Sequence, residues 1–199
     1  MRGTINVQEL DPILERCRRG DNLAWEALVR RTQSRVYGLA LQYVRDPDEA
    51  SDLAQEIFIK IYRNLDKMET GSAFMPWLVR LSRNCCIDRI RRIKARPPAR
   101  DVVVDEDLEL KSSAPSPEQS WDTDRRKQLV YQAMGKLSEQ NREILLLKEI
   151  QQLKLTEIAG MLGLPVGTIK SRASRARVEL AKSVLKLDPS YGAAAATGG

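Results

Sequence analysis

The sequence has no histidine, only three cysteines, and few aromatic residues, which make up 5% of its 199 residues. Without histidine and without a Cys-x-x-Cys pair, the chain lacks the ligand pattern of a structural zinc site. Cys17, Cys85 and Cys86 do not predict disulfides, and the last two fall within a helical pattern as small core residues. We therefore expect no metal and no cofactor, and a reducing, cytoplasmic location.

Long apolar runs are missing as well. No stretch of about eighteen apolar residues is present, and the N-terminus has no signal-peptide core, so we expect no membrane insertion. The chain also lacks a Gly-rich phosphate loop and carboxylates at metal-binding spacing. With no catalytic constellation, an enzyme acting on nucleic acid is the weakest function class, and we expect no catalytic residue.

Charge is abundant but unevenly distributed along the chain. Residues 1–94 carry 17 basic and 13 acidic side chains, residues 95–124 carry 3 and 8, and residues 125–199 carry 13 and 6. The three segments therefore have net charges of +4, −5 and +7. The two basic segments suit a phosphate backbone, which would repel the acidic segment between them.

Apolar residues recur at helical spacing through most of the chain, with no convincing alternating strand, which predicts an all-α fold. We expect two small helical domains, residues 1–95 and 125–187, joined by a flexible acidic linker rich in Pro and Ser over residues 96–124. Residues 188–199 read as a disordered tail. Expected helices cover approximately residues 7–19, 23–44, 47–65, 73–94, 123–137 and 138–150.

Local signals place several of these helix ends. Asp46 and Glu49 form a capping box around Pro47, the expected first residue of the third helix. In the fourth helix, apolar side chains at helical spacing predict a core face comprising Trp77, Leu78, Leu81, Cys85 and Ile90. Phe74 can plug the interior or stack on a base, and the core position is favoured.

Residues 155–177 have the pattern of a helix-turn-helix, the DNA-binding motif whose second helix enters the major groove. Thr156 is expected to cap the first helix, Gly163 to end it in a left-handed conformation, and Pro165 to start the second. The inward face of the second helix is expected to consist of Val166, Ile169, Ala173, Ala176 and Leu180.

Polar and basic side chains occupy the rest of this second helix. We expect base-edge contacts from Lys170, Ser171, Ser174 and Arg175, and phosphate contacts from Thr168, Arg172 and Arg177. A solvated basic helix closing a bundle is the alternative, but the turn residues favour DNA binding.

Four motifs occur in a characteristic order and spacing: Asp52-Leu-Ala-Gln-Glu-Ile-Phe58, Phe74-Met-Pro-Trp-Leu-Val-Arg-Leu-Ser-Arg-Asn84 with Asp88-Arg89, Leu137-Ser-Glu-Gln-Asn-Arg-Glu-Ile144, and Pro165-Val-Gly-Thr-Ile-Lys-Ser-Arg172. In these motifs the chain resembles bacterial sigma factors of the extracytoplasmic-function (ECF) branch of the sigma-70 superfamily. The resemblance implies a factor that binds core RNA polymerase, recognises a promoter and opens its strands. It also implies an inhibitory anti-sigma factor as a partner.

The resemblance assigns a task to each domain. The second domain would read the minus-thirty-five element and contact the flap of the second-largest polymerase subunit. The first would hold the minus-ten element and dock its third helix on the clamp of the largest subunit. The implied polymerase-contacting residues are Asp48, Asp52, Leu53, Gln55, Glu56 and Ile59. Independently of the family, the polar members form an acidic strip that suits a basic protein groove, with a plain solvated face as the alternative.

The fourth helix carries a basic stripe of Arg80, Arg83, Asn84, Arg91 and Arg92. We hypothesise that it tracks single-stranded phosphates, while Asn84 and the loop residues Glu69, Thr70, Gly71 and Ser72 hold an extruded base. The acidic linker would lie in a positively charged polymerase channel, or serve only as a solubilising spacer. A transcription activator with a similar C-terminal module is the competing function, but residues 1–95 lack the strand-helix alternation of a receiver domain.

Overall fold

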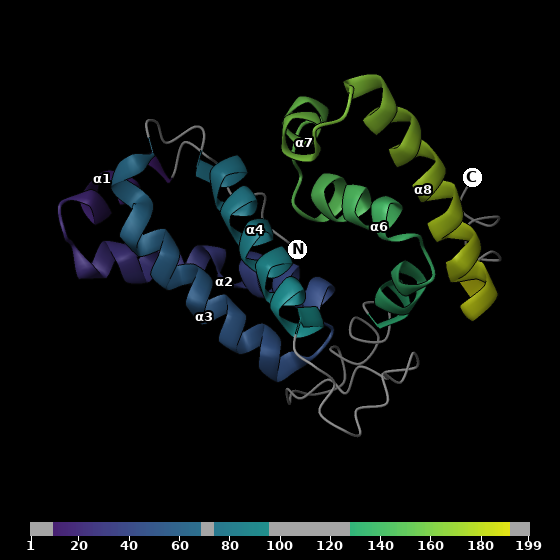
Figure 1. The fold of residues 1–199 in the computed structure, drawn as a ribbon, viewed down its shortest axis with the longest axis horizontal. Coiled ribbons are helices and arrows are strands. Elements are labelled where there is room, and N and C mark those ends of the chain that lie inside the picture. The colour runs from purple at the N-terminus through teal and green to yellow at the C-terminus, as the bar shows by residue number, and fades with distance from the viewer. Residues whose placement is uncertain (1–9, 69–73, 96–127, 192–199) are drawn as a thin grey trace. The chain divides into compact units, whose positions relative to one another are not determined.

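A computed structural model describes residues 10–68, 74–95 and 128–191 of the chain. They divide between two compact units, Met1–Glu109 and Leu110–Gly199. Within the described ranges every regular element is a helix, which confirms the all-α prediction (Figure 1). None of these helices is long and apolar enough to span a membrane. The predictions for the acidic linker, for most of the tail and for loop residues 69–72 lie outside the described residues.

The first unit contains α1 (Asp11–Arg18), α2 (Asn22–Val44), α3 (Pro47–Asn64), the short 3-10 helix η2 (Leu65–Lys67) and α4 (Phe74–Ala95). Helix α2 packs against α1, α3 and α4, and α3 also packs against α4 (Figure 1). Trp25 joins α2 to α3 through edge contacts with Phe58 and Tyr62, with ring centroids 6.4 and 5.0 Å apart.

Caps fix where α2 and α3 begin. The Asp21 carboxylate accepts hydrogen bonds from the Leu23 and Ala24 amides, at 2.9 and 3.1 Å. Asp46 accepts from the Glu49 amide at 2.8 Å, and Pro47 opens α3 as predicted. The second half of the predicted capping box is replaced by a tertiary contact, because the Glu49 carboxylate faces Arg89 of α4 at 3.4 Å.

Among the buried core residues that the structure describes in the first unit, Phe74 is the one aromatic residue, and the others are aliphatic or sulfur-containing. Phe74 is fully buried, as predicted, and all three cysteines are buried free thiols. The buried residues of α3 are the predicted set of Ala50, Leu53, Ala54, Ile57 and Ile61, with Leu65 following. In α4 the burial of Leu78 and Cys85 is complete or nearly so, whereas Trp77, Leu81 and Ile90 are half-buried.

The second unit consists of a helix over residues 128–135, α6 (Glu139–Leu145), a π-helix labelled η4 (Leu146–Ile150), α7 (Leu155–Leu162) and α8 (Val166–Leu187). Ser138 caps α6, accepting from the Asn141 amide at 3.4 Å. Residues 138–150 were expected to form one uniform helix, but they change from α to π at Leu146.

Two details predicted for the helix-turn-helix are wrong. The cap of α7 is Lys154 rather than Thr156, and its amide donates to Glu157 Oε2 at 2.7 Å. The Glu157 side chain reaches back to satisfy this amide, so the helix begins without a threonine cap. Val166 was placed on the inward face of α8 but is 42% exposed, and it is the first residue of that helix.

Candidate nucleic-acid and protein interfaces

Helices α7 and α8 are joined by a tight turn that orients α8. Gly163 ends α7 with a φ of 67°, the left-handed conformation that favours glycine, as predicted. Pro165 caps α8, one residue before its first helical position. Ile169, Ala173 and Ala176 pack inward from α8, and Ile158 and Ala159 from α7. Because alanine side chains are small, α8 packs closely through this side, and the opposite side of the helix is exposed.

The outer side of α8 carries the predicted DNA-contacting residues. Lys170, Ser171, Ser174 and Arg175, the four assigned to base edges, are all exposed. Of the residues assigned to phosphates, Arg177 is exposed, whereas Thr168 and Arg172 are half-buried. The structure thus brings all seven residues into residues 168–177 of a single helix.

The basic side chains of this helix fall into two groups according to their partners. Arg172 Nη1 donates to Gln140 Oε1 of α6 at 2.7 Å. Arg177 Nε and Nη2 both donate to Glu149 Oε1 of the π-helix, at 2.8 and 2.7 Å. Among the residues that the structure describes, Lys170 and Arg175 make no such contact. These tethers were missed from the sequence, since they join residues about 30 positions apart.

Helix α4 presents the predicted basic stripe. Arg80, Asn84 and Arg91 are exposed and follow one another at i, i+4 and i+11, which places them on one face. Arg83 is half-buried, and Arg91 Nη1 lies 3.8 Å from Asp88 Oδ1 in an exposed ion pair. The face can therefore offer a line of cations and one amide to a nucleic-acid strand. The other predicted members, Glu69, Thr70, Gly71 and Ser72, lie outside the described residues.

The outer face of α3 carries the predicted acidic strip. Asp48, Asp52, Gln55 and Glu56 are exposed, and Ile59, the next residue along this face, is 51% exposed. Leu53 is 1% exposed and belongs to the core, so the structure removes it from this surface. An acidic strip that ends in an apolar residue suits a protein partner rather than DNA.

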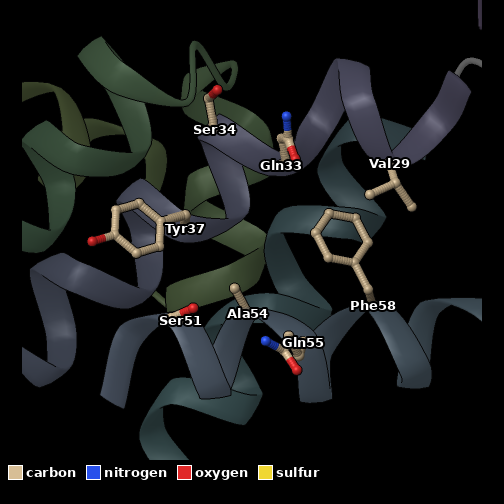
Figure 2. A pocket seen from close by; sticks show the side chains of 8 residues that line it. All are labelled: Val29, Gln33, Ser34, Tyr37, Ser51, Ala54, Gln55 and Phe58. Carbon is tan, nitrogen blue, oxygen red and sulfur yellow. The ribbon is translucent and has the colours of Figure 1, made fainter. Parts of the chain in front are cut away.

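A groove of about 400 Å³ lies between α2 and α3, beside this strip. Figure 2 shows Phe58 and Tyr37 on its sides and Ala54 and Gln55 from α3 below. Its other lining residues are Val29, Gln33, Ser34 and Ser51. The groove extends the α3 face with an apolar depression that can receive a side chain of a partner.

One arginine connects the acidic strip to α4. Arg89 Nη2 donates to Glu56 Oε1 at 3.0 Å, and its Nη1 lies 3.4 Å from Glu49 Oε2. The Arg89 side chain is 23% exposed, so part of the pair is shielded from water. This contact locks α3 to α4 and offsets part of the negative charge of the strip.

The cysteines are not candidates for nucleophilic chemistry. Burial raises the pKa of Cys86 to about 12 and also raises the pKa of Cys17 and Cys85, although Lys60 Nζ lies 3.4 Å from Cys85 Sγ. Within the described ranges, no group of three or more carboxylate or thiol side chains could hold a metal ion.

Comparison with known proteins gives consistent matches to both units. Residues 28–96 match the family model for Sigma-70 region 2, and residues 127–180 match the model for Sigma-70, region 4. The RNA polymerase sigma-H factor of Pseudomonas aeruginosa is 37% identical over 188 residues, covering 91% of this chain and 97% of that protein. The ECF RNA polymerase sigma-E factor of Escherichia coli K12 is 34% identical over 180 residues, covering 88% and 94%.

Solved structures give the same result for the fold. The sigma factor RpoE from Bartonella quintana, in complex with the anti-sigma factor NepR, matches with a TM-score of 0.61 and 28% identity, covering 82% of this chain and 97% of that one. CnrH, in complex with the cytosolic domain of CnrY, matches with a TM-score of 0.62 at 23% identity, covering 90% and 99%.

Proposed function

Because the chain belongs to the extracytoplasmic-function branch of the sigma-70 family, we propose a specific division of labour between its surfaces in promoter recognition and transcription initiation. Helix α8 reads the minus-thirty-five element, α4 holds the minus-ten strand, and the outer face of α3 docks on core RNA polymerase. The exposed set on α8, with Lys170 and Arg175 lacking partners among the described residues, is the observation that carries the proposal.

The role of α8 follows from the chemistry of its outer side. Arginine and lysine can donate two hydrogen bonds to guanine, and serine hydroxyls suit several base edges. Ser171 Oγ donates to the Thr168 carbonyl at 3.0 Å, which leaves its oxygen available as an acceptor. The tethered Arg172 and Arg177 flank this set, so their guanidinium groups are held where phosphates on either side of the groove can be met.

The role of α4 is supported by its exposed stripe. Arg80 and Arg91 provide cations for a single strand, and Asn84 between them provides an amide that can hydrogen-bond to an extruded base. Extruding a base costs a few kcal/mol, and such contacts offset that cost. Loop residues 69–72 are included in this proposal on the sequence pattern alone.

The outer face of α3 suits the clamp of the largest polymerase subunit, through its acidic strip, Ile59 and the groove of Figure 2. We extend the proposal to the second unit, which would contact the flap of the second-largest subunit, and to the acidic linker, which would lie in a positively charged polymerase channel. An activator that works without polymerase contact is disfavoured, since residues 28–96 match Sigma-70 region 2.

An anti-sigma factor is the proposed regulatory partner. Two structurally similar proteins were solved as complexes, one with an anti-sigma factor and the other with a cytosolic domain of a second protein. A partner that covered the α3 face would block the proposed polymerase docking.

Two substitutions separate the DNA-binding steps. In the full-length factor bound to core polymerase, Arg175→Ala should weaken closed-complex formation by about 1–3 kcal/mol and relax one base position. Asn84→Ala should leave closed-complex formation intact but reduce permanganate reactivity of the opened strands. Promoters selected from a random library with the wild-type holoenzyme provide the DNA, and each variant is the control for the other. Wild-type closed-complex formation by Arg175→Ala, together with wild-type permanganate reactivity in Asn84→Ala, would refute the assignment.

A further inference from the structure

The ion pair between Arg177 and Glu149 stands on the flank of the proposed recognition helix. Both nitrogens of Arg177 that make the contact use the same carboxylate oxygen of Glu149, at 2.7 and 2.8 Å. The two side chains remain 55% and 47% exposed, so the pair is accessible to a ligand. Arg177 lies seven residues after Lys170, which places both on the same flank of α8.

Glu149 lies in the π-helix, directly after a buried apolar run. Residues 144–147 are four consecutive apolar residues, each at most 2% exposed. The first two lie at the end of α6 and the other two open the π-helix, so the backbone changes from α to π within this buried run. Glu149 follows on the exposed side, against α8, and the left-handed Gln152 with φ 57° then redirects the chain toward α7. A rare backbone form thus delivers an acidic side chain to a basic helix.

We propose that Glu149 limits the sequence-independent attraction of α8 for DNA. The inference rests on the proposed role of α8 in reading duplex DNA. Cations that meet phosphates supply binding that is independent of sequence, whereas contacts to base edges supply discrimination. By offsetting the charge of Arg177, Glu149 weakens the attraction to phosphates. It leaves unchanged the base-edge contacts made by residues such as Arg175. Affinity for every sequence falls by a similar factor, and base-edge contacts supply a larger share of the remaining binding free energy.

The test is Glu149→Gln in the full-length chain bound to core polymerase. Glutamine retains the shape and an acceptor oxygen for Arg177 but removes the charge. The probes are a duplex selected by the wild-type holoenzyme and a scrambled duplex of equal length, titrated over a range of KCl concentrations. On the scrambled duplex the variant should bind up to about fivefold more tightly at low salt. Its plot of log K against log [KCl] should steepen by up to about 0.9, the value for one phosphate contact.

Glu179→Gln is the matched control. Glu179 is also exposed and lies on α8, and its substitution by glutamine changes the net charge by the same amount. Its carboxylate, however, accepts a hydrogen bond from Asn141 Nδ2 at 2.9 Å rather than from an arginine. We expect this variant to keep the wild-type slope. Equal steepening in both variants would attribute the effect to net charge and overturn the proposal, as would an unchanged slope in Glu149→Gln. In an Arg177→Gln background, Glu149→Gln should have no further effect.

The outcome for Arg175→Ala separates this inference from the function on which it rests. If Arg175→Ala leaves the preference for the selected duplex unchanged, the proposed role of α8 fails. If that preference is lost while Glu149→Gln binds both duplexes as the wild type does, only the inference about Glu149 fails. Urea denaturation of each variant is the control for whether the second unit remains folded.

Discussion

At the scale of single residues, polar side chains in this protein stabilise helix ends more than they build the core. Asp21 is the clearest case, since its carboxylate accepts from two amides at the start of α2 and pairs with Arg16 at 2.7 Å. The Ala24 amide, and then the Arg16 side chain, hold the pKa of Asp21 below its usual value. The ionised form is therefore the one that stabilises the fold.

This cap predicts a pH dependence with a definite sign. Because the folded pKa is depressed, the stabilisation is fully present above the ordinary aspartate pKa, about 3.9, and is lost as pH falls through the lower folded pKa. Asp21→Asn keeps an acceptor oxygen but loses the charge, so it should unfold at lower urea concentration than the wild type at pH 7. The difference in urea midpoint between the two should shrink as the pH drops below about 4. A difference that stays constant at low pH would contradict the role of the charge.

Residue patterns in the sequence identified the exposed faces well but could not reveal their partners. The exposure of Lys170, Ser174 and Arg175 followed from helical periodicity alone, because buried alanines recur on the opposite side. The tether from Arg177 to Glu149 depends on how two helices pack, which periodicity does not encode. Leu53 was placed on a contact surface by resemblance, whereas its own periodicity already predicted burial.

At the scale of elements, most helix ends were predicted to within a few residues, and the start of α7 was not. Asp46 and Pro47 define the start of α3, and Gly163 the end of α7, as expected. The start of α7 was misplaced because Thr156 is a good capping residue by type, while Glu157 satisfies the Lys154 amide instead. The π-helix was missed because helical periodicity in a sequence does not distinguish a π turn from an α turn.

The turn of the helix-turn-helix supplies a prediction at this scale. A Cβ added to Gly163 would meet nothing within 4 Å, so the cost of Gly163→Ala arises from its left-handed backbone alone. We expect the free energy of unfolding of the second unit to fall by about 1–2 kcal/mol. Urea denaturation followed by circular dichroism measures the change.

Gly160→Ala is the matched control for that substitution. Gly160 lies within α7, and an added Cβ there would also meet nothing within 4 Å, but its backbone is helical. This variant should be more stable than the wild type by about 0.5–1 kcal/mol. Equal destabilisation of both variants would show that the side chain, not the backbone conformation, is responsible.

At the scale of the whole molecule, the distribution of charge matches the proposed partners. The acidic residues of α3 form one surface, and the basic residues of α4 and α8 form others, so the total charge of +6 conceals distinct binding faces. Arg89 joins the acidic face to α4 inside the first unit. The net charge of +4 over residues 1–94 indicated the basic stripe but concealed the acidic strip, which the folded helices place on a different face.

This separation predicts that one acidic residue affects assembly while another does not. Asp52→Asn should weaken binding of the full-length factor to core polymerase, by up to about fivefold, because it removes a charge from the proposed docking face. Asp11→Asn removes an exposed charge from α1 and should leave that affinity unchanged. Competition between each variant and the labelled wild-type factor for core polymerase measures the effect. Equal affinities for the two variants would place the docking surface elsewhere.

The way α8 is held has a consequence for engineering and for divergence within the family. Arg172 and Arg177 attach the helix to Gln140 and Glu149, and they differ from the four residues proposed to contact base edges. Those four residues can therefore be substituted without breaking the contacts that hold α8 in place. Combinatorial libraries at Lys170, Ser171, Ser174 and Arg175 should therefore yield folded factors with new promoter preferences. Such orthogonal factors could coexist in one cell and drive separate genetic circuits from a shared polymerase.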